Sequence, residues 1–212
     1  HKNGTAGQSP RDTYNGKSTI NFAEIIKKII IKNNCKNLLD YGSGKGDRYF
    51  NESVRSDGKK FPPLKDYWNI ESTFFDPGVP YPKPTKSVFD IVLCIDVLEH
   101  IPYQDLGWVL NEILRIGKHA IISFPNFGHW LCRFQLFLYG KMPVTEDLKL
   151  TWYDTQNIHL CTMKDFFELL EDMKLTSKEI YGITRNKKVI QSNKNFLNIF
   201  AAHAVLLVER SN

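Results

Sequence analysis

The stretch Leu38-Leu-Asp-Tyr-Gly-Ser-Gly-Lys-Gly46 decides the fold, because it joins a short apolar run to an acid and three alternating glycines. The apolar run is typical of the end of a buried parallel strand, which would place Asp40 at the carboxyl edge of a sheet. Ligands bind at this edge in open α/β sheets. Because Gly42, Gly44 and Gly46 tolerate positive φ and let a ligand approach the main chain, we interpret the stretch as a nucleotide-cofactor loop.

The spacing of the loop narrows the class of cofactor. Its G-x-G-x-G pattern differs from the G-x-G-x-x-G of dinucleotide-binding folds. An acid two residues before the first glycine suits a cofactor with a cationic amino-acid tail, since Asp40 can hold an ammonium group directly or through water. S-adenosylmethionine (SAM) has such a tail. The alternative is an ordinary glycine turn between a strand and a helix, and the loop alone does not decide between the two.

Composition indicates a globular protein of ordinary size. The chain has 212 residues, of which 42% are hydrophobic and 24% charged, and its net charge of +5 includes no block of basic residues. Binding to nucleic acid is therefore not required. We expect residues 1–18 to be a flexible tail and residues 19–212 to form a single domain.

The cysteines and the hydrophobic runs predict the compartment. Four cysteines never form C-x-x-C, which favours reduced thiols over disulfides or a metal site: Cys35, Cys94, Cys132 and Cys161. No uninterrupted apolar run approaches the length of a membrane span, and we find no signal peptide. We therefore expect a cytoplasmic protein without a metal.

The chain before the second acid alternates between regular and irregular segments. Isoleucines at helical spacing predict a helix from Asn21, with Asn21 and Glu24 as a capping box. A strand is expected at 37–41, a short helix at 47–54 and a polar surface loop at 55–69.

Asp76 ends the next predicted strand, at 71–75. A carboxylate at this point can accept hydrogen bonds from both hydroxyls of a ribose. The separation from Asp40 is 76 − 40 = 36 residues, longer than the roughly 20 that are usual, so the polar loop would be an insertion. The alternative is a turn residue before Pro77-Gly78.

The rest of the chain continues the alternation of strand and helix. Residues 77–87 are proline-rich and irregular, and a strand at 89–94 leads into an acidic segment that bears His100. A helix stopped by Gly117, a strand at 120–122 and a helix capped by Thr162 and Asp165 follow. Strands at 178–184 and 200–208, separated by a basic, flexible loop, would close the sheet as an antiparallel hairpin. The pattern predicts a doubly wound α/β fold.

Three motifs in order resemble the class I SAM-dependent methyltransferases: Asp40-x-Gly-x-Gly-x-Gly, Asp76 and Phe89-Asp90-Ile-Val-x-x-x-Asp96-Val-Leu-Glu-His100. The resemblance implies a Rossmann-like, mostly parallel sheet of seven or six strands with helices on both faces. It also implies SAM as the cofactor and S-adenosylhomocysteine as its product. The cofactor-binding residues it implies are Asp40, Tyr41, Gly42, Gly44, Gly46, Asp76, Pro77, Asp96, Val97 and Leu98.

Residues 109–173 closely resemble the methionine-biosynthesis MetW family. The motifs that carry this are Ser123-Phe-Pro-Asn-Phe-Gly-His-Trp130, Gly140-Lys-Met-Pro-Val-Thr145 and Trp152-Tyr-Asp-Thr-Gln-Asn-Ile-His-Leu-Cys161. The front half departs from the family in its Leu98-Glu99-His100 signature and in the insertion before Asp76, and looks more like generic small-molecule methyltransferases. This second resemblance implies a link to a homoserine acyltransferase of methionine biosynthesis.

Polar and aromatic residues in the same segment are candidates for substrate binding. Asn126 and His129 would follow a strand end into the cleft, and Tyr153 and Asn157 lie in a stretch rich in hydrogen-bonding side chains. Trp130 begins an aromatic helical pattern that would roof the pocket, form a subunit contact such as a homodimer, or simply face the core.

Three residues are candidate proton acceptors for methyl transfer: His100, Glu99 and His159. Methyl transfer from a sulfonium depends mainly on holding the nucleophile in line in a dry pocket, and a base matters only if the nucleophile carries a proton. Structural roles are the alternative for each of the three, as helix caps or as packed, hydrogen-bonded side chains.

Three functions remain open from the sequence. The first is a SAM-dependent methyltransferase acting on a small molecule, with protein substrates left open. The second is a SAM-binding accessory protein that binds an acyltransferase and has little activity of its own. The third, a nicotinamide-dependent oxidoreductase, is disfavoured by the glycine spacing.

Overall fold

The computed structural model describes residues 17–76, 88–146, 148–155 and 157–211. Residues 1–16 of the predicted tail, the proline-rich segment 77–87 and the predicted cofactor residue Pro77 lie outside the described residues. The chain forms two compact units, one containing residues up to 95 together with 112–121, and the other containing 96–111 and the chain from 122 onwards.

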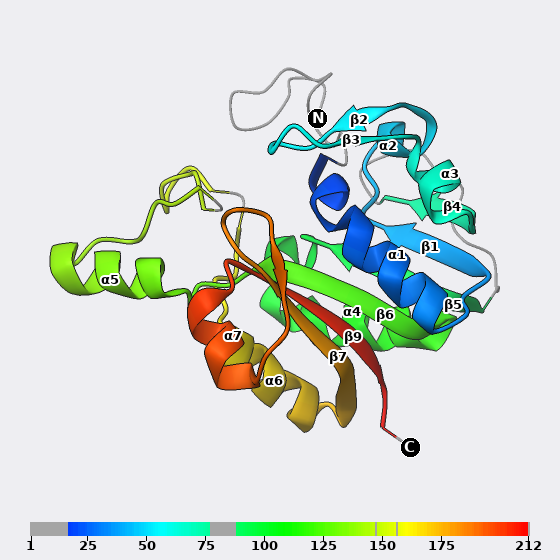
Figure 1. The fold of residues 1–212 in the computed structure, drawn as a ribbon. Helices are drawn as coiled ribbons and strands as arrows, with labels where there is room; N and C mark the ends of the chain where they lie inside the picture. The colour runs from blue at the N-terminus through cyan, green and yellow to red at the C-terminus, as the bar shows by residue number, and fades with distance from the viewer. Residues whose placement is uncertain (1–16, 77–87, 147, 156, 212) are drawn as a thin grey trace. The chain divides into compact units, whose positions relative to one another are not determined.

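Seven strands form one sheet in the order β4-β1-β5-β6-β9-β7-β8 (Figure 1). β1 pairs in parallel with β4 and β5, whereas β7 pairs antiparallel with β8 and β9. The predicted α/β fold with a mostly parallel, Rossmann-like sheet is therefore confirmed. The strands are β1 Asn37–Tyr41, β4 Glu71–Phe75, β5 Phe89–Ile95, β6 Gly117–Pro125, β7 Leu175–Ile183, β8 Val189–Ile190 and β9 His203–Arg210.

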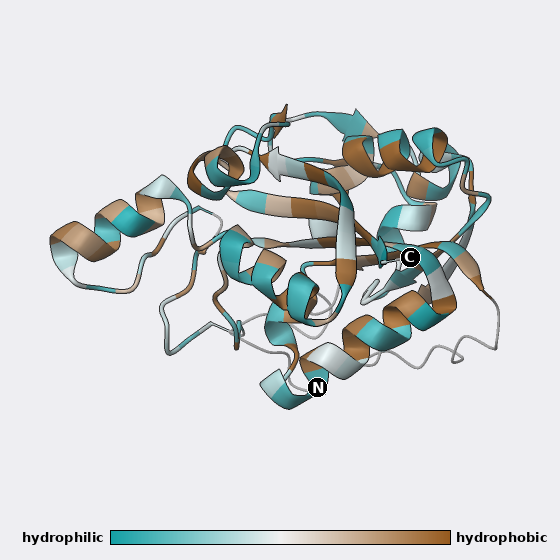
Figure 2. Cartoon of the chain, turned by 90° about the horizontal axis from the view of Figure 1, so that it is seen from below, coloured by the Kyte–Doolittle hydropathy of each residue, from teal (hydrophilic) through white to brown (hydrophobic). Residues whose placement is uncertain are grey.

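Buried aliphatic side chains explain why β1 and β5 lie inside the sheet. Leu38, Leu39 and residues 91–94 are fully buried, as expected for strands that are covered on both faces. Figure 2 shows hydrophobic colouring along the strands of the sheet. Burial of these apolar side chains stabilises the strands inside the sheet. Each strand therefore ends, and the loop after it begins, where the apolar run ends.

The first helix begins differently from the prediction. A 3-10 helix, η1 (Lys17–Phe22), runs directly into α1 (Ala23–Lys32), and no side chain caps the junction. The predicted capping box of Asn21 and Glu24 is wrong, because the Glu24 carboxylate instead pairs with Arg55 at 2.8 Å and with Lys59 at 2.6 Å. α1 ends at Lys32, and Asn33 is its C-cap.

The region between β1 and β4 is more ordered than the sequence indicated. It contains α2 (Asp47–Phe50), the hairpin of β2 (Ser53–Val54) and β3 (Lys60–Phe61), and α3 (Leu64–Trp68). The expected helix over 47–54 is thus too long, and the expected surface loop at 55–69 is wrong. The physical reason is burial: Phe61, Leu64 and Trp68 are inside, and Trp68 donates a hydrogen bond from its indole nitrogen to the Ala23 carbonyl at 2.9 Å.

The second unit contains the C-terminal hairpin and four helical elements of its own. Here the capping box of Thr162 and Asp165 is confirmed, and so is the antiparallel pairing of β7 with β9. The flexible loop expected at 185–194 instead contains β8, and a helix that begins at Lys194 runs to Phe200, so the last strand begins at His203 rather than at 200. The helical elements are η2 Leu98–His100, α5 Trp130–Tyr139, α6 Met163–Asp172 and α7 Lys194–Phe200, and α4 Tyr103–Ile116 contributes residues to both units.

α5 is an unusual helix because most of its hydrophobic side chains are exposed. Only Cys132 is buried in it, so the alternative of a core-facing helix is wrong. Phe137 is 86% exposed, and Trp130, Phe134, Leu136, Leu138 and Tyr139 also lie on the surface. An apolar surface of this kind is typical of an interaction site.

Two expectations about the whole chain can be compared with the described residues. None of the four cysteines forms a disulfide within the described residues, and three of them are buried. Within the described residues, no helix is both long enough and apolar enough to cross a bilayer.

Candidate functional site

The glycine loop adopts the conformation that its spacing requires. Gly42, Gly44 and Gly46 have φ of 84°, 57° and 67°, a region that residues with a Cβ rarely adopt. The Gly42 amide donates to the Phe75 carbonyl at 2.8 Å, which ties the loop to the end of the neighbouring strand β4. The structure therefore places this loop at the carboxyl ends of β1 and β4.

Asp76 lies directly against the glycine loop. Tyr41 pairs with Phe75 in the parallel β1–β4 register, so the next residues of both strands come together. The Asp76 side chain is buried, and its Oδ2 accepts a hydrogen bond from the Gly44 amide at 2.8 Å. The acid predicted to bind ribose and the loop predicted to bind the amino-acid tail thus form one constellation.

Asp40 is a buried acid that accepts a hydrogen bond from one side chain among the described residues. It is 1% exposed, and the Tyr49 hydroxyl donates to its Oδ2 at 2.8 Å. The pKa of Asp40 is raised to about 7, mainly by burial; the Tyr49 hydrogen bond acts to lower it, and the nearby charge of Asp76 adds to the rise. Sequence reasoning missed Tyr49, whose only signal is its place in the short helix that follows the loop.

In the second unit, Asp96 has a strained backbone conformation. Its φ is 52°, unusual for a residue with a side chain, and such strain often marks functional sites. The Ser123 hydroxyl donates to Asp96 Oδ1 at 2.7 Å, and the Asp96 amide donates to the Ser123 carbonyl at 3.2 Å. The other two cofactor-binding residues predicted in this segment are Val97, which is half-buried, and Leu98, which is buried. Ser123 belongs to one of the MetW-like motifs, but no local pattern pairs it with Asp96.

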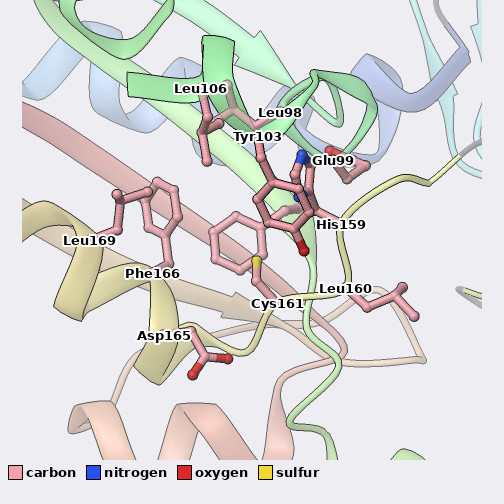
Figure 3. Close-up of a pocket in the computed structure, with 11 residues that line it drawn as sticks. Leu98, Glu99, Tyr103, Leu106, His159, Leu160, Cys161, Asp165, Phe166 and Leu169 are labelled. Atoms are coloured by element: carbon pink, nitrogen blue, oxygen red, sulfur yellow. The ribbon is translucent and has the colours of Figure 1, made fainter. Parts of the chain in front are cut away.

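A cavity of about 280 Å³ lies within the second unit (Figure 3). Glu99, His159 and Tyr103 gather at one end of it, and residues of α6 form the other end. Its volume is just below the roughly 300 to 1,000 Å³ of small-molecule pockets. The lining residues are Leu98, Glu99, Tyr103, Leu106, Phe124, His159, Leu160, Cys161, Asp165, Phe166 and Leu169.

Main-chain hydrogen bonds hold the polar end of this pocket. The Glu99 carbonyl accepts from the amides of Ile158, at 2.7 Å, and His159, at 3.1 Å, so the chain at 158–159 is fixed to η2. The His159 Nε2 contacts the Ile101 carbonyl, and the Tyr103 ring lies edge-on to the imidazole with 3.8 Å between ring centroids. Two of the three predicted bases, Glu99 and His159, are thereby brought together.

His100 has a different environment from the other two candidates. It is exposed at the end of η2 and does not line the pocket. Its catalytic role stays a prediction, and the geometry favours Glu99 and His159 as the groups that a ligand in the pocket would meet.

Glu99 carries the main electrostatic feature of the pocket. It is 5% exposed, and its Oε2 is buried without a hydrogen-bond partner among the described residues. Burial raises the pKa of Glu99 well above its ordinary value, and the charge of Asp96 raises it further. Burial also raises the pKa of Cys161 to about 12, so this residue lines the pocket as a neutral thiol.

The predicted substrate residue Asn126 does not line this pocket, and its side chain has its full set of hydrogen bonds. Its amide nitrogen donates to the carbonyls of Asn198 at 3.0 Å and Ala201 at 2.8 Å. Its oxygen accepts from the amides of Gly128 at 3.0 Å and Met163 at 3.2 Å. These four bonds use every donor and acceptor site of the side chain, so it joins β6, α6 and α7.

The other predicted substrate residues also lie outside the pocket lining. His129 accepts at Nδ1 from the Leu131 amide at 3.3 Å and so caps α5. Trp130 and Tyr153 are 45% and 69% exposed, and Asn157 is half-buried. Substrate binding by these residues stays a prediction.

The fold of this chain is similar to that of solved SAM-dependent methyltransferases. It is similar to the small RNA methyltransferase HEN1, with 17% identity, a TM-score of 0.56, and coverage of 92% of this chain and 25% of that one. It is also similar to the mitomycin 7-O-methyltransferase MmcR, with 11% identity, a TM-score of 0.52, and coverage of 90% and 54%. A magnesium protoporphyrin IX methyltransferase (ChlM) from Synechocystis PCC 6803, solved with bound SAH, matches at 14% identity, a TM-score of 0.50, and coverage of 92% and 86%. At these identities the likeness establishes the fold.

The sequence comparison identifies the family more narrowly. The model of the methionine biosynthesis protein MetW family matches residues 81–208, and the chain belongs to this family. The match begins upstream of the motifs that predicted it. A bifunctional methionine biosynthesis protein MetXA/MetW from Rhodopirellula baltica is 30% identical over 127 residues, which are 58% of this chain. The match spans 20% of that longer protein.

Proposed function

We propose that this protein is a SAM-dependent methyltransferase that acts on a small-molecule acceptor. The observation that carries the proposal is the constellation at the ends of β1 and β4, where the Gly44 amide is bonded to buried Asp76 and buried Asp40 lies at the root of the same loop. Three positive-φ glycines, one acid for a cation and one acid for a diol fit the parts of SAM.

Each residue of this constellation would hold a defined part of the cofactor. The loop from Tyr41 to Gly46 would surround the methionine portion, Asp40 would hold its ammonium group and Asp76 its ribose hydroxyls. When bound, SAM supplies a methyl group on a positively charged sulfur. Because the Asp40 pKa is about 7, this carboxyl keeps a proton in part of the molecules at neutral pH, and an approaching cation would displace that proton.

The pocket of the second unit supplies the properties that an acceptor needs. Its walls are mostly apolar, and a ligand that fills it would displace water and so strengthen the effect of the few polar groups inside it. Glu99 and His159 are the two groups placed to receive a proton from a nucleophile.

Turnover tests the proposed function. The purified full chain is incubated with methyl-labelled SAM and a metabolite extract, and labelled products are separated from unreacted cofactor. We expect a labelled small molecule, its amount reduced at least tenfold by Asp76→Ala, whereas Asp66→Asn on the exposed face of α3 leaves it unchanged. SAM binding without a labelled product from any extract would contradict the proposal.

A second candidate function is supported by one comparison and one surface. The MetXA/MetW relative carries two functions in one longer chain, and α5 exposes an apolar surface. An accessory protein that binds a homoserine acyltransferase through α5 would use both features.

A pull-down tests this second candidate with the purified acyltransferase as prey. A stable complex that is lost with Phe137→Ser and Leu138→Ser but kept with Ile31→Ser, an exposed apolar residue of α1, would support it. Recovery of the isolated protein alone would exclude it.

A further inference from the structure

The pocket of the second unit has an uneven chemical lining that restricts its ligand. Six of its lining side chains are leucine or phenylalanine, and the polar ones include two carboxyls and a single imidazole but no lysine or arginine. The apolar walls favour a hydrophobic body, while the acidic groups disfavour an anion.

We propose that this pocket binds a small apolar amine, whose ammonium group pairs with Glu99. Only one part of this inference rests on the proposed function, namely that the bound amine is the methyl acceptor. Binding of the amine is a separate property and can be measured without turnover.

The environment of Glu99 explains why a cation is the favoured partner. Its Oε2 is buried and has no hydrogen-bond partner among the described residues, and such a group costs about 1–3 kcal/mol while it stays unsatisfied. A hydroxyl would satisfy it with an ordinary hydrogen bond. An ammonium group would form a charge-assisted bond, roughly twice as strong, and would also offset the repulsion between Glu99 and Asp96.

The geometry keeps Glu99 in place for this contact. Its carbonyl is bonded to the amides of Ile158 and His159, so the residue is held by its main chain while its Oε2 has no hydrogen-bond partner among the described residues. The His159 Nε2 faces the Ile101 carbonyl, which can only accept, so this nitrogen donates to that carbonyl and not to the Glu99 carboxyl.

An amine acceptor would first lose a proton and then receive the methyl group. The ammonium group passes one proton to the Glu99 carboxylate, which leaves a neutral nitrogen with a free electron pair. The nitrogen–methyl bond then forms as the sulfur–methyl bond breaks, with the electron pair of the broken bond remaining on sulfur and the positive charge moving to nitrogen.

Three probes with one skeleton test the binding: phenethylamine, 2-phenylethanol and phenylacetate. Each is titrated into the ¹⁵N-labelled full chain, with and without S-adenosylhomocysteine, and Kd is measured from amide shifts. We expect the amine to bind at least about tenfold more tightly than the alcohol, with the acid weakest. Equal affinities for amine and alcohol, or no binding by any probe, would overturn the inference.

Variants separate the carboxyl from the rest of the pocket. Glu99→Gln is expected to abolish the preference for amine over alcohol, whereas Glu168→Gln, the same change at an exposed position of α6, keeps it. Leu106→Phe, which fills the cavity, should weaken binding of all three probes. A preference that survives Glu99→Gln would refute the role of Glu99.

The same titration distinguishes this inference from the proposed function. Loss of S-adenosylhomocysteine binding with amine binding intact would contradict the cofactor site alone. Intact S-adenosylhomocysteine binding without an amine preference would contradict the amine site alone.

Discussion

The acids of the glycine loop and the acid of the second-unit pocket are both buried, but they differ in their partners. Asp40 accepts from Tyr49 and Asp76 accepts from Gly44, whereas Oε2 of Glu99 has no hydrogen-bond partner among the described residues. The loop is thus organised by bonds within its own unit, while the pocket presents an acid whose hydrogen bonding is incomplete. A preformed loop suits an invariant cofactor, and an unpaired group in an apolar pocket suits selection of a variable ligand.

The largest expected effect concerns the ionised form of Asp40, which we expect to destabilise the folded protein. The pKa of Asp40 is about 7 in the folded protein, against a usual 3.8, so the folded state binds more protons between these values. Its contribution therefore lowers the free energy of unfolding as the pH rises from about 4 to 7, by at most about 4 kcal/mol. Asp40→Asn should remove this dependence and be more stable than the wild type at pH 8.

Urea unfolding of wild type, Asp40→Asn and the exposed control Asp66→Asn at pH 5 and pH 8 measures this difference. The same stability difference between wild type and Asp40→Asn at both pH values would contradict this role of the buried acid in the glycine loop. Such a result would mean that Asp40 ionises normally.

Asn126 provides a test within the second unit. Asn126→Ala removes four hydrogen bonds and leaves buried amide and carbonyl groups of β6, α6 and α7 unpaired, so we expect a loss of about 3 kcal/mol. Chemical denaturation measures it, with Asn111→Ala on the exposed face of α4 as the control. A loss below about 1 kcal/mol would show that these groups find other partners, and Asn126 would become available as a substrate residue.

Tyr49→Phe sharpens the contrast between a partnered and an unpartnered acid. The substitution removes the hydrogen bond that Asp40 Oδ2 accepts from the Tyr49 hydroxyl. We expect the free energy of unfolding to fall by about 1–2 kcal/mol at pH 8. The loss should be smaller at pH 5, because the Tyr49 hydrogen bond lowers the Asp40 pKa and therefore stabilises the ionised carboxyl most. Equal losses at the two pH values would contradict this assignment.

The smallest expected effect concerns α5, which belongs to neither site. Phe137 is 86% exposed, so Phe137→Ser should change stability by less than about 0.5 kcal/mol. Thermal unfolding with Phe134→Ser, a half-exposed neighbour on the same helix, provides the comparison. A large loss from Phe137→Ser would show that this side chain is covered in solution, as in a homodimer.

The two regions also differ in how far the sequence predicts them. β1 and β4 have the predicted bounds, because local signals mark where they end. The apolar run of β1 leads into the glycine loop, and β4 is followed by an acid, a proline and a glycine. The positive φ of the three loop glycines follows from the same local pattern. The fold and the cofactor loop are therefore accessible to sequence reasoning.

The features that sequence reasoning missed depend on distant contacts. Glu24 was expected to cap a helix, but Arg55 and Lys59 are 31 and 35 residues away and take its carboxylate. Phe61, Leu64 and Trp68 lie among polar and proline residues, which hid their burial. Glu99 and His159 were each candidates, yet only the fold shows that a main-chain bond joins them across 60 residues of chain.

Calorimetric titration with SAM and with S-adenosylhomocysteine tests the central claim most directly, using wild type, Asp76→Ala and Asp76→Asn. Asp76→Asn keeps an oxygen that can accept from the Gly44 amide, so it separates support of the loop from binding of the ribose. The account predicts that wild type binds both ligands and that Asp76→Ala weakens binding by at least about 100-fold, since two charge-assisted hydrogen bonds are lost. Asp76→Asn should fall between them. No binding by the wild type, or equal binding by wild type and Asp76→Ala, would contradict the assignment of the glycine loop as the cofactor site.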